Sequence, residues 1–244
     1  MNRIVELKEK YLKTKFVEIN AKRSKQWPVP TEDLAIYIDH TILKADASDE
    51  AVTKVCAEAE EHKFRSVCVN PVNAALAKTN LPNVDLCCVV GFPLGQNSTE
   101  ITVAEAKKAI ADGAVEIDMV INNGWMKSQK YADVEADITA VAEACHQNGA
   151  ILKVIIETCL LTGDEKIIAC ILSMNANADF VKTSTGFNTG GATVEDIALM
   201  RETVGENLGV KASGGVRDRA AAIAMLKAGA NRIGASAGIK IIQK

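Results

Sequence analysis

The chain of 244 residues has few aromatic side chains, only three histidines and little net charge. Its formal charge of −3 and its pI near 5.7 give no electrostatic footprint for nucleic acid. No run reaches the roughly 18 uncharged apolar residues of a membrane-spanning helix. Residues 1–16 lack the apolar region of a signal peptide. We therefore expect a cytoplasmic protein with neither nucleic acid nor a membrane as partner.

The sequence also lacks the spacings that hold metals or dinucleotides. Its seven cysteines are odd in number, show no C-x-x-C pair and lie mostly in apolar stretches such as "DLCCVV". We interpret them as reduced thiols that form neither disulfides nor a zinc site. Two of the three histidines, His62 and His146, fall in separate helical segments, which disfavours a His-rich catalytic zinc site. No G-x-G-x-x-G follows the first expected strand, so a dinucleotide site is only weakly indicated.

What the chain does have is an alternation of short Val- and Ile-rich runs with helical patterns. Several of the runs are almost continuously apolar, as in buried parallel strands. Eight βα units in about 210 residues favour a closed (β/α)8 barrel over an open doubly wound sheet. The expected strands cover residues 34–39, 65–70, 85–92, 115–121, 151–157, 179–184, 209–213 and 231–236.

The helical segments and the domain boundary follow from the same patterns. Residues 98–113 read as a helix with Ile101, Ala104 and Ala109 spaced for one face. Residues 1–30 read as an additional amphipathic helix that caps the barrel bottom or contributes to a subunit interface. No low-complexity linker divides the rest, so we predict a single barrel domain over residues 31–244.

Among the charged residues within the expected strands, five point to a common site. Lys153, Lys182 and Lys211 follow one another at intervals of 29 residues, and Asp118 and Asp39 hold comparable places on two other strands. If each interval is one βα unit, the three lysines occupy similar levels on strands five, six and seven. In barrels, active sites lie at the C-terminal ends of the strands. The pattern therefore predicts a cavity lined by one carboxylate and three lysines.

Less specific interpretations remain open at this point. A lone strand lysine can extend to the surface, and the whole set can be a structural network of ion pairs. Lys153 precedes a short apolar run and has only supporting status, and Asp39 and His40 can simply cap the first strand. The small residues that follow two of the lysines favour a ligand site: "TSTG" after Lys182 and "ASGG" after Lys211.

Two neighbouring lysines have a specific chemical use. Mutual repulsion and partial burial lower the pKa of one of the two, and a neutral amine attacks carbonyls to form a Schiff base. The iminium then acts as an electron sink for C–C bond cleavage. Asp118 is suitably placed in the pattern to transfer protons during these steps.

The loops after strands seven and eight, "SGGVRD" and "GASAG", predict a phosphate site of backbone N–H groups, to which Arg217 could add charge. The alternative is that their glycines only form tight turns. The candidates are Gly214, Gly215, Gly234 and Ser236. Cys68 ends strand two, where it can face the cavity as a reactive thiol or, as we favour, serve as a buried structural residue.

Eight motifs carry a resemblance to a known family: "YIDHT", "VCVNP", "VVGFPLG", "EIDMVIN", "LKVIIET", "FVKTSTGF", "KASGGVR" and "RIGASAG". In this order, over about residues 34–238, they resemble the deoxyribose-phosphate aldolases. The resemblance implies a (β/α)8 barrel and a class I aldolase without metal or cofactor. It also implies reversible cleavage of 2-deoxy-D-ribose 5-phosphate to D-glyceraldehyde 3-phosphate and acetaldehyde, in deoxyribonucleotide catabolism.

The resemblance also implies roles for particular residues. The lysine of "KTSTG", Lys182, is the Schiff-base residue, Lys211 of "KASGGVR" tunes its amine and assists proton transfer, and Asp118 of "EIDMV" is the proton donor and acceptor. The phosphate site maps to Gly186, Gly214, Gly215, Gly234 and Ser236. A homodimer or homotetramer is expected from the general prevalence of symmetric oligomers.

The chain departs from some members of that family at three points. Phe187 stands where some carry a phosphate-binding lysine, Ala237 stands where some have a second serine, and no tyrosine follows Tyr131. Two other functions are alternatives to an aldolase: a phosphate-binding isomerase or epimerase that forms no covalent bond, and a non-catalytic barrel that senses a sugar phosphate. Neither needs two neighbouring strand lysines.

Overall fold

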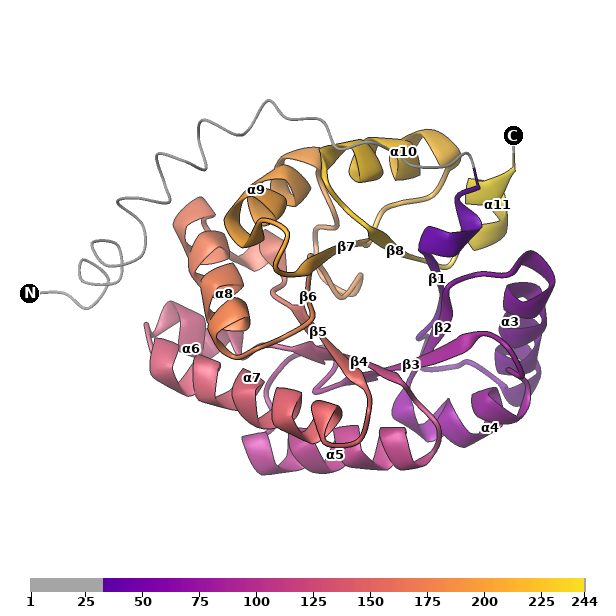
Figure 1. Cartoon of the computed structure of the whole chain (residues 1–244), viewed down its shortest axis with the longest axis horizontal. Coiled ribbons are helices and arrows are strands. Elements are labelled where there is room, and N and C mark those ends of the chain that lie inside the picture. Colours follow the sequence, from indigo (N-terminus) through magenta and orange to yellow (C-terminus); the bar gives the residue numbers. More distant parts are fainter. Residues whose placement is uncertain (1–32, 244) are drawn as a thin grey trace, which may run out of the picture.

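The computed structural model describes residues 33–243 and shows a closed barrel of eight parallel strands. The strands pair in chain order, β1 with β2 through to β8, which pairs back with β1, and the helices form a ring outside them (Figure 1). The predicted (β/α)8 barrel is therefore confirmed. The additional helix expected within residues 1–30 lies outside the described residues.

The elements follow the expected alternation. The strands are β1 (Ile38–Ile42), β2 (Ser66–Val69), β3 (Asp85–Val90), β4 (Glu116–Val120), β5 (Ile151–Ile155), β6 (Phe180–Lys182), β7 (Gly209–Ser213) and β8 (Arg232–Ala235). The α-helices are α3 (Asp49–His62), α4 (Ala74–Thr79), α5 (Thr99–Ala111), α6 (Asn123–Lys127), α7 (Tyr131–His146), α8 (Gly163–Asn175), α9 (Val194–Val204), α10 (Arg219–Ala228) and α11 (Gly238–Ile242). Short 3-10 turns are η2 (Ala35–Tyr37), η3 (Pro71–Asn73) and η4 (Thr158–Leu160).

The first strand begins later than its sequence pattern suggests. Residues 34–39 were expected to be extended, but η2 occupies Ala35–Tyr37 and β1 starts at Ile38. Leu34, Ala35 and Tyr37 are nevertheless buried. The apolar run thus predicted burial correctly except at Ile36, which is exposed. Burial alone does not distinguish a strand from a short helical turn.

Helix α5 has a different buried face from the one expected. Thr102, Ala106 and Ala109 are buried, whereas Ile101 is 58% exposed and Ala104 is also exposed. The buried positions follow an i, i+4, i+7 spacing, which is the spacing of one helix face. The expectation was right for Ala109 and wrong for the other two residues.

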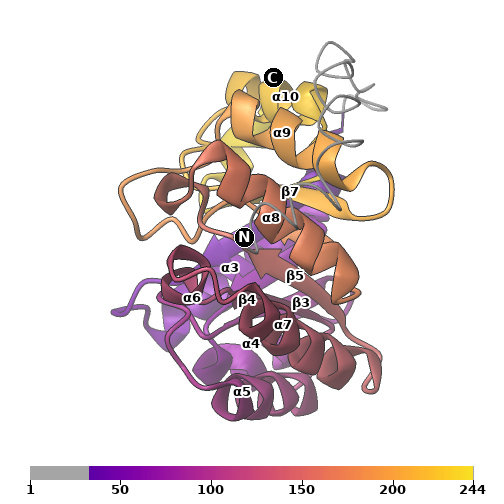
Figure 2. The same ribbon diagram turned by 90° about the vertical axis from the view of Figure 1, so that its left-hand side faces the viewer.

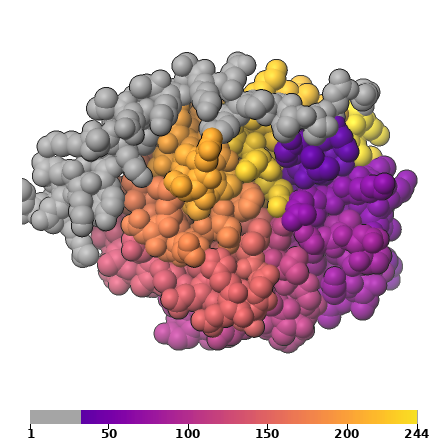
Figure 3. Space-filling view, viewed as in Figure 1, coloured from indigo at the N-terminus to yellow at the C-terminus, as the bar shows by residue number. Residues whose placement is uncertain are grey.

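Residues on the barrel strands alternate between an apolar outer layer and a polar interior. Outward-facing side chains such as Ile117, Leu152 and Val210 belong to the hydrophobic core between strands and helices. In the side view α7 and α8 lie in front of β5 (Figure 2). In the space-filling view, atoms cover the centre of the ring that looks open in the ribbon (Figure 3). The inward-facing strand positions are therefore where the candidate functional residues lie.

No helix within residues 33–243 is long and apolar enough to cross a bilayer.

Candidate active site

Lys182 and Lys211 meet at one carboxylate inside the barrel. They are directly opposite each other in the β6–β7 register. The Nζ atoms of both lysines donate to Oδ2 of Asp118, each at 2.7 Å. The two nitrogens are therefore no farther apart than twice that distance. The structure thus brings together the three residues for which the sequence predicted chemistry.

Lys153 belongs to the same cluster but lies at a different level from Lys182. In the β5–β6 register Lys182 is opposite Ile155, and Lys153 is opposite Phe180, two residues earlier. The equal 29-residue intervals therefore misplaced Lys153, because the length of a βα unit does not fix the register between its strands. Lys153 Nζ lies 2.7 Å from Asp118 Oδ1, so its contact with the cluster is closer than its supporting status suggested.

A second set of charges lies beside these residues, and sequence reasoning missed two of its members, Glu116 and Arg232. Arg232 Nη1 donates to Asp39 Oδ1 at 2.7 Å and to Glu116 Oε2 at 2.9 Å. Asp39 Oδ2 lies 2.5 Å from Lys211 Nζ, and Glu116 Oε2 lies 2.7 Å from Lys153 Nζ. All of these side chains are buried. Asp39 is thus a member of the network and not merely a cap on β1.

The missed residues left a usable signal in the sequence. Glu116 precedes Asp118 by two positions, and Arg232 precedes Gly234 by two, so each shares the inward face of its strand with a residue that was singled out. A period of two applied to every charged residue in the strands would have found both.

The electrostatics of the cluster fix the charge of Asp118. Burial opposes ionisation, but Lys153, Lys182 and Lys211 together hold the pKa of Asp118 well below its ordinary value. Burial likewise opposes the charge of Lys211, yet Asp118 and Asp39 raise the pKa of Lys211. Burial again opposes the charge of Lys153, but its carboxylate neighbours, Asp118 foremost, raise its pKa well above the ordinary value. At neutral pH, Asp118 is a carboxylate held by ammonium groups.

This arrangement modifies the expectation for the lysine pair. Repulsion between Lys182 and Lys211 was expected to dominate, but a carboxylate oxygen lies between their two nitrogens. The three lysines also differ in access. The side chains of Lys153 and Lys211 are completely buried, whereas that of Lys182 is 4% exposed. Lys182 also ends β6, and the loop that follows becomes exposed from Gly186 onward. It is therefore the lysine of this cluster that a ligand reaches most directly.

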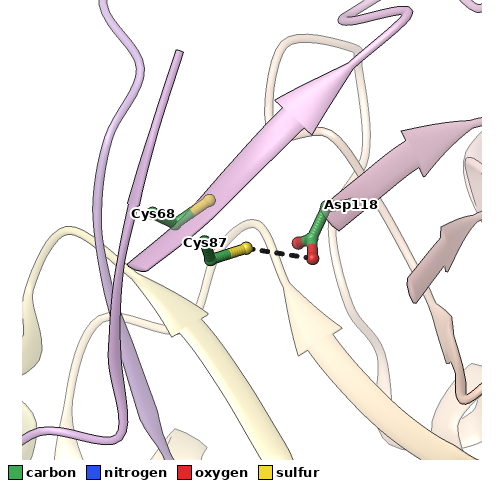
Figure 4. Close-up of side chains that lie close together, drawn as sticks. All are labelled: Cys68, Cys87 and Asp118. Atoms are coloured by element: carbon green, nitrogen blue, oxygen red, sulfur yellow. Dashed lines mark hydrogen bonds between the residues drawn. The ribbon is translucent and has the colours of Figure 1, made fainter. Parts of the chain in front are cut away.

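Cys68 faces the barrel interior beside Cys87, which was not singled out from the sequence. The two residues are directly opposite each other in the β2–β3 register. Cys87 Sγ donates to Asp118 Oδ1 at 3.2 Å (Figure 4). Despite burial, the hydrogen bond with Cys87 and the nearby lysines lower the pKa of Cys68, whereas burial and the contact with Cys68 raise that of Cys87. All seven cysteines lie within the described residues and are free thiols.

The predicted phosphate-binding glycines lie in loops that approach each other closely. Gly186, Gly214 and Gly215 have φ values of +83°, +79° and +81°, a region that favours glycine. Gly191, which the sequence analysis did not single out, lies in the loop after β6 and packs against the loop after β7. A Cβ on Gly191 would lie 2.3 Å from the carbonyl oxygen of Gly214. The loops after β6 and β7 therefore meet backbone to backbone.

The remaining phosphate candidates have separate surroundings. A Cβ on Gly234 would lie 2.4 Å from Ser213 Oγ and 3.0 Å from Lys211 Cε, so the missing side chain makes room for Lys211. Ser236 follows β8 and is exposed. The hydroxyls of Ser184 and Ser213 are buried and have no hydrogen-bond partner among residues 33–243. These two unpaired groups are further candidates to contact a polar ligand.

Glu157 anchors the loop after β6. This buried residue has φ +56°, and its carboxylate accepts hydrogen bonds from the backbone N–H of Thr185 at 3.3 Å and from its hydroxyl at 2.5 Å. On the same loop Phe187 is 54% exposed and packs its ring edge-on against Phe92, with centroids 5.3 Å apart. Phe187, which stands where some members of the resembled family have a lysine, therefore forms an aromatic pair with Phe92 instead of offering a charge.

Comparisons with known proteins match this chain to one family. The family model described as DeoC/LacD family aldolase matches residues 34–244. The chain is 57% identical over 210 residues to a deoxyribose-phosphate aldolase of Clostridium tetani, covering 85% of this chain and 97% of that protein. It is 59% identical over 213 residues to one of Exiguobacterium sp., covering 86% and 96%.

Solved structures agree with the sequence comparisons. A putative deoxyribose-phosphate aldolase from Coccidioides immitis superposes with a TM-score of 0.84 at 43% identity, covering 94% of this chain and 95% of that one. A deoxyribose phosphate aldolase from Aeropyrum pernix, described as having a unique tetrameric structure, gives a TM-score of 0.80 at 33% identity and covers 93% and 96%.

Proposed function

The chain belongs to the DeoC/LacD family of aldolases, and on that premise we propose that it reversibly cleaves 2-deoxy-D-ribose 5-phosphate through a Schiff base on Lys182. The products are D-glyceraldehyde 3-phosphate and acetaldehyde. The observation that carries the proposal is the cluster in which Lys182 and Lys211 donate to the same oxygen of Asp118 while Lys182 alone of the two retains exposed surface.

The first half of the reaction builds the imine. The neutral amine of Lys182 attacks the aldehyde carbon of the open-chain sugar, and the carbonyl oxygen takes up a proton to give a carbinolamine. Loss of water from this adduct forms the iminium. Asp118, 2.7 Å from the Lys182 nitrogen in the free protein, is placed to accept the ammonium proton and to return a proton to the departing hydroxyl.

The second half breaks the carbon–carbon bond. Removal of the proton from the C3 hydroxyl lets the C2–C3 electron pair move into the iminium, which becomes a neutral enamine and releases glyceraldehyde 3-phosphate. Protonation of the enamine at C2 restores an iminium, and water hydrolyses it to acetaldehyde and free Lys182. The reaction needs no external electron donor or acceptor, because the iminium itself takes up the electron pair.

The neighbouring charges support these steps. Asp118 and Asp39 keep Lys211 as an ammonium group close to Lys182. An ammonium group at that place can donate a hydrogen bond to the substrate or to Asp118. Lys153, paired with Glu116 and Asp118, holds the Asp118 carboxylate in position from its other oxygen.

The phosphate group is assigned to the loops after β6, β7 and β8. Gly186, Gly214 and Gly215 supply backbone N–H groups in conformations that allow close approach. Gly234 and Ser236 complete the set on the last strand and the residue that follows it. Since Phe187 contributes no charge, backbone donors carry more of the phosphate recognition here than in members with a lysine at that position.

The variant Gly191→Ala tests the phosphate assignment. A Cβ at this position would lie 2.3 Å from the Gly214 carbonyl oxygen, so the loop carrying Gly214 and Gly215 must move. We expect KM for 2-deoxyribose 5-phosphate to rise roughly tenfold or more, the equivalent of about one strong hydrogen bond. The kcat/KM for unphosphorylated 2-deoxyribose should change far less. Steady-state kinetics with both sugars measures the difference.

Gly163→Ala is the matched control, since a Cβ on Gly163 meets nothing within 4 Å. Gly163→Ala should leave KM and kcat/KM unchanged for both sugars. Equal losses of kcat/KM for the phosphorylated and the free sugar in Gly191→Ala would contradict a phosphate site in these loops.

Reductive trapping tests the proposed function itself. Sodium borohydride added with acetaldehyde or 2-deoxyribose 5-phosphate should convert the imine into a stable secondary amine on Lys182, which peptide mass mapping locates. If no lysine is labelled while turnover persists, the covalent mechanism is wrong and a barrel that catalyses without a Schiff base replaces it. Phosphate binding without turnover would instead favour the non-catalytic sensor.

Two broader predictions go with the proposal. A homodimer or homotetramer is expected from the prevalence of symmetric oligomers, and the tetrameric relative from Aeropyrum pernix supports it. A cytoplasmic location is the second of these predictions.

A further inference from the structure

A group of metal-binding atoms lies within the barrel on its second, third and fourth strands. The sulfur atoms of Cys68 and Cys87 and a carboxylate oxygen of Asp118 all lie within 4.8 Å of one another. All three residues are buried, and Figure 4 shows both sulfurs on the side of the barrel that faces the Asp118 carboxylate. No C-x-x-C spacing signals this group, because its ligands come from three different strands and register alone brings them together.

The donor set suits a thiophilic divalent cation. Zn²⁺ and Cd²⁺ prefer thiolate ligands, and carboxylate completes many such sites. Around a tetrahedral Zn²⁺ with bonds of about 2.3 Å, two sulfurs are about 3.8 Å apart. The present separations of at most 4.8 Å are therefore within about 1 Å of that geometry. Rotation of two cysteine side chains can supply this movement without moving a strand.

We propose that Cys68, Cys87 and Asp118 form a binding site for a thiophilic divalent cation such as Zn²⁺ or Cd²⁺, and that a cation there inhibits the enzyme. Water or a substrate oxygen takes the fourth position. Binding releases one proton from each thiol to solvent, forms two metal–sulfur bonds and involves no oxidation or reduction.

The charges around the site permit this exchange. Lys153, Lys182 and Lys211 all contact Asp118, and a bare dication added among them would be repelled. A dication that replaces two thiol protons leaves the total charge of the cluster unchanged. Lys153 Nζ already lies 3.3 Å from Cys87 Sγ, so an ammonium is in place to donate to the thiolate that the metal creates.

Inhibition follows from the double use of Asp118. Its Oδ1 faces Cys87 and Lys153, and its Oδ2 accepts from Lys182 and Lys211. A cation bound at Oδ1 withdraws electron density from the same carboxylate that the proposed function uses for proton transfer. Loss of activity should therefore accompany occupancy, even though the metal does not touch Lys182.

Cadmium titration of the reduced full-length protein tests the site directly. The ultraviolet charge-transfer absorption of Cd–thiolate bonds reports binding without any need for turnover. We expect a saturable increase at one equivalent of Cd²⁺, with a parallel loss of aldolase activity that EDTA restores. Cys68→Ala and Cys87→Ala should each weaken this binding by about 10- to 100-fold or more.

The chain offers a matched control on the same strand. Cys88 is buried next to Cys87 but belongs to the outer hydrophobic core, whereas Cys87 belongs to a separate interior cluster. Cys88→Ala should bind Cd²⁺ as the unmodified protein does and retain activity. Cys159→Ser, which removes the exposed thiol, should also retain the one-equivalent titration.

Unchanged Cd²⁺ affinity in a folded Cys68→Ala or Cys87→Ala protein, or no charge-transfer absorption in the unmodified protein, would overturn the proposal. Circular dichroism identifies which variants are folded, and either of the two suffices. The outcome is separable from the proposed function, because Lys182→Met should still give the absorption change although it cannot form the Schiff base.

Discussion

Replacing Lys182 with methionine is expected to abolish turnover while the barrel stays folded. Methionine has a similar length but no amine, so the imine cannot form, and loss of a covalent nucleophile lowers kcat by on the order of 10⁴-fold or more. Asp118 keeps two of its three ammonium partners, Lys153 and Lys211, so its charge remains compensated. Activity with 2-deoxyribose 5-phosphate, borohydride labelling and thermal unfolding should all be measured on the same preparation.

A surface variant provides the control for this experiment. Lys108 lies on α5 with an exposed side chain. Within residues 33–243 its only ion pair is with Asp112, one helical turn further along the chain. Lys108→Met should leave kcat and labelling unchanged. If Lys182→Met retains activity within tenfold of the unmodified enzyme, Lys182 is not the nucleophile, and peptide mapping of the labelled variant would show whether Lys211 or Lys153 takes that role.

Asp118→Asn is expected to damage both catalysis and stability. The amide cannot accept and return protons, and loss of general acid–base catalysis lowers kcat by about 10²- to 10⁴-fold. The substitution also leaves three neighbouring ammonium groups without their shared carboxylate. Breaking a buried ion pair from one side costs about 3–5 kcal/mol in the free energy of unfolding. Few single substitutions in this protein should have a comparable combined effect.

The stability loss should depend on pH in a defined way. Because the pKa of Asp118 is lowered in the folded state, its contribution is present above the unfolded value of about 3.9 and is lost as pH falls further. Because the pKa values of Lys153 and Lys211 are raised, their contribution is present below about 10.4 and is lost as pH rises through the folded values. The difference between the unmodified protein and Asp118→Asn should therefore be largest between about pH 4 and pH 10.

Urea unfolding of both proteins from about pH 3 to about pH 11 measures the predicted profile, because this range spans the unfolded pKa values of the carboxylate and the lysines. Asp133→Asn serves as the control, because it makes the same change at an exposed acidic residue of α7. It should shift the unfolding free energy by less than about 0.5 kcal/mol at every pH. A penalty for Asp118→Asn that stays constant up to pH 11 would mean that the lysine charges are compensated by other groups.

The sequence by itself determined the type of fold and the chemistry. Near-continuous apolar runs such as the one around Lys153, alternating with helical periodicity, favour parallel strands covered by helices, and eight such units favour a closed barrel. A lysine at the end of such a run, followed by "TSTG", is costly to bury unless its charge is compensated or given up. That reasoning predicted Lys182, Lys211 and Asp118 without any coordinates.

Only the tertiary structure decided which charged groups meet. Lys153 sits two residues out of register with Lys182, Arg232 bridges Asp39 and Glu116, and Cys87 faces Asp118 from the neighbouring strand. Hydrophobic periodicity indicates which face of a strand is buried, but it does not determine how far one strand is displaced along the next. That displacement is set when the barrel closes, because all eight strand pairings must then be satisfied together.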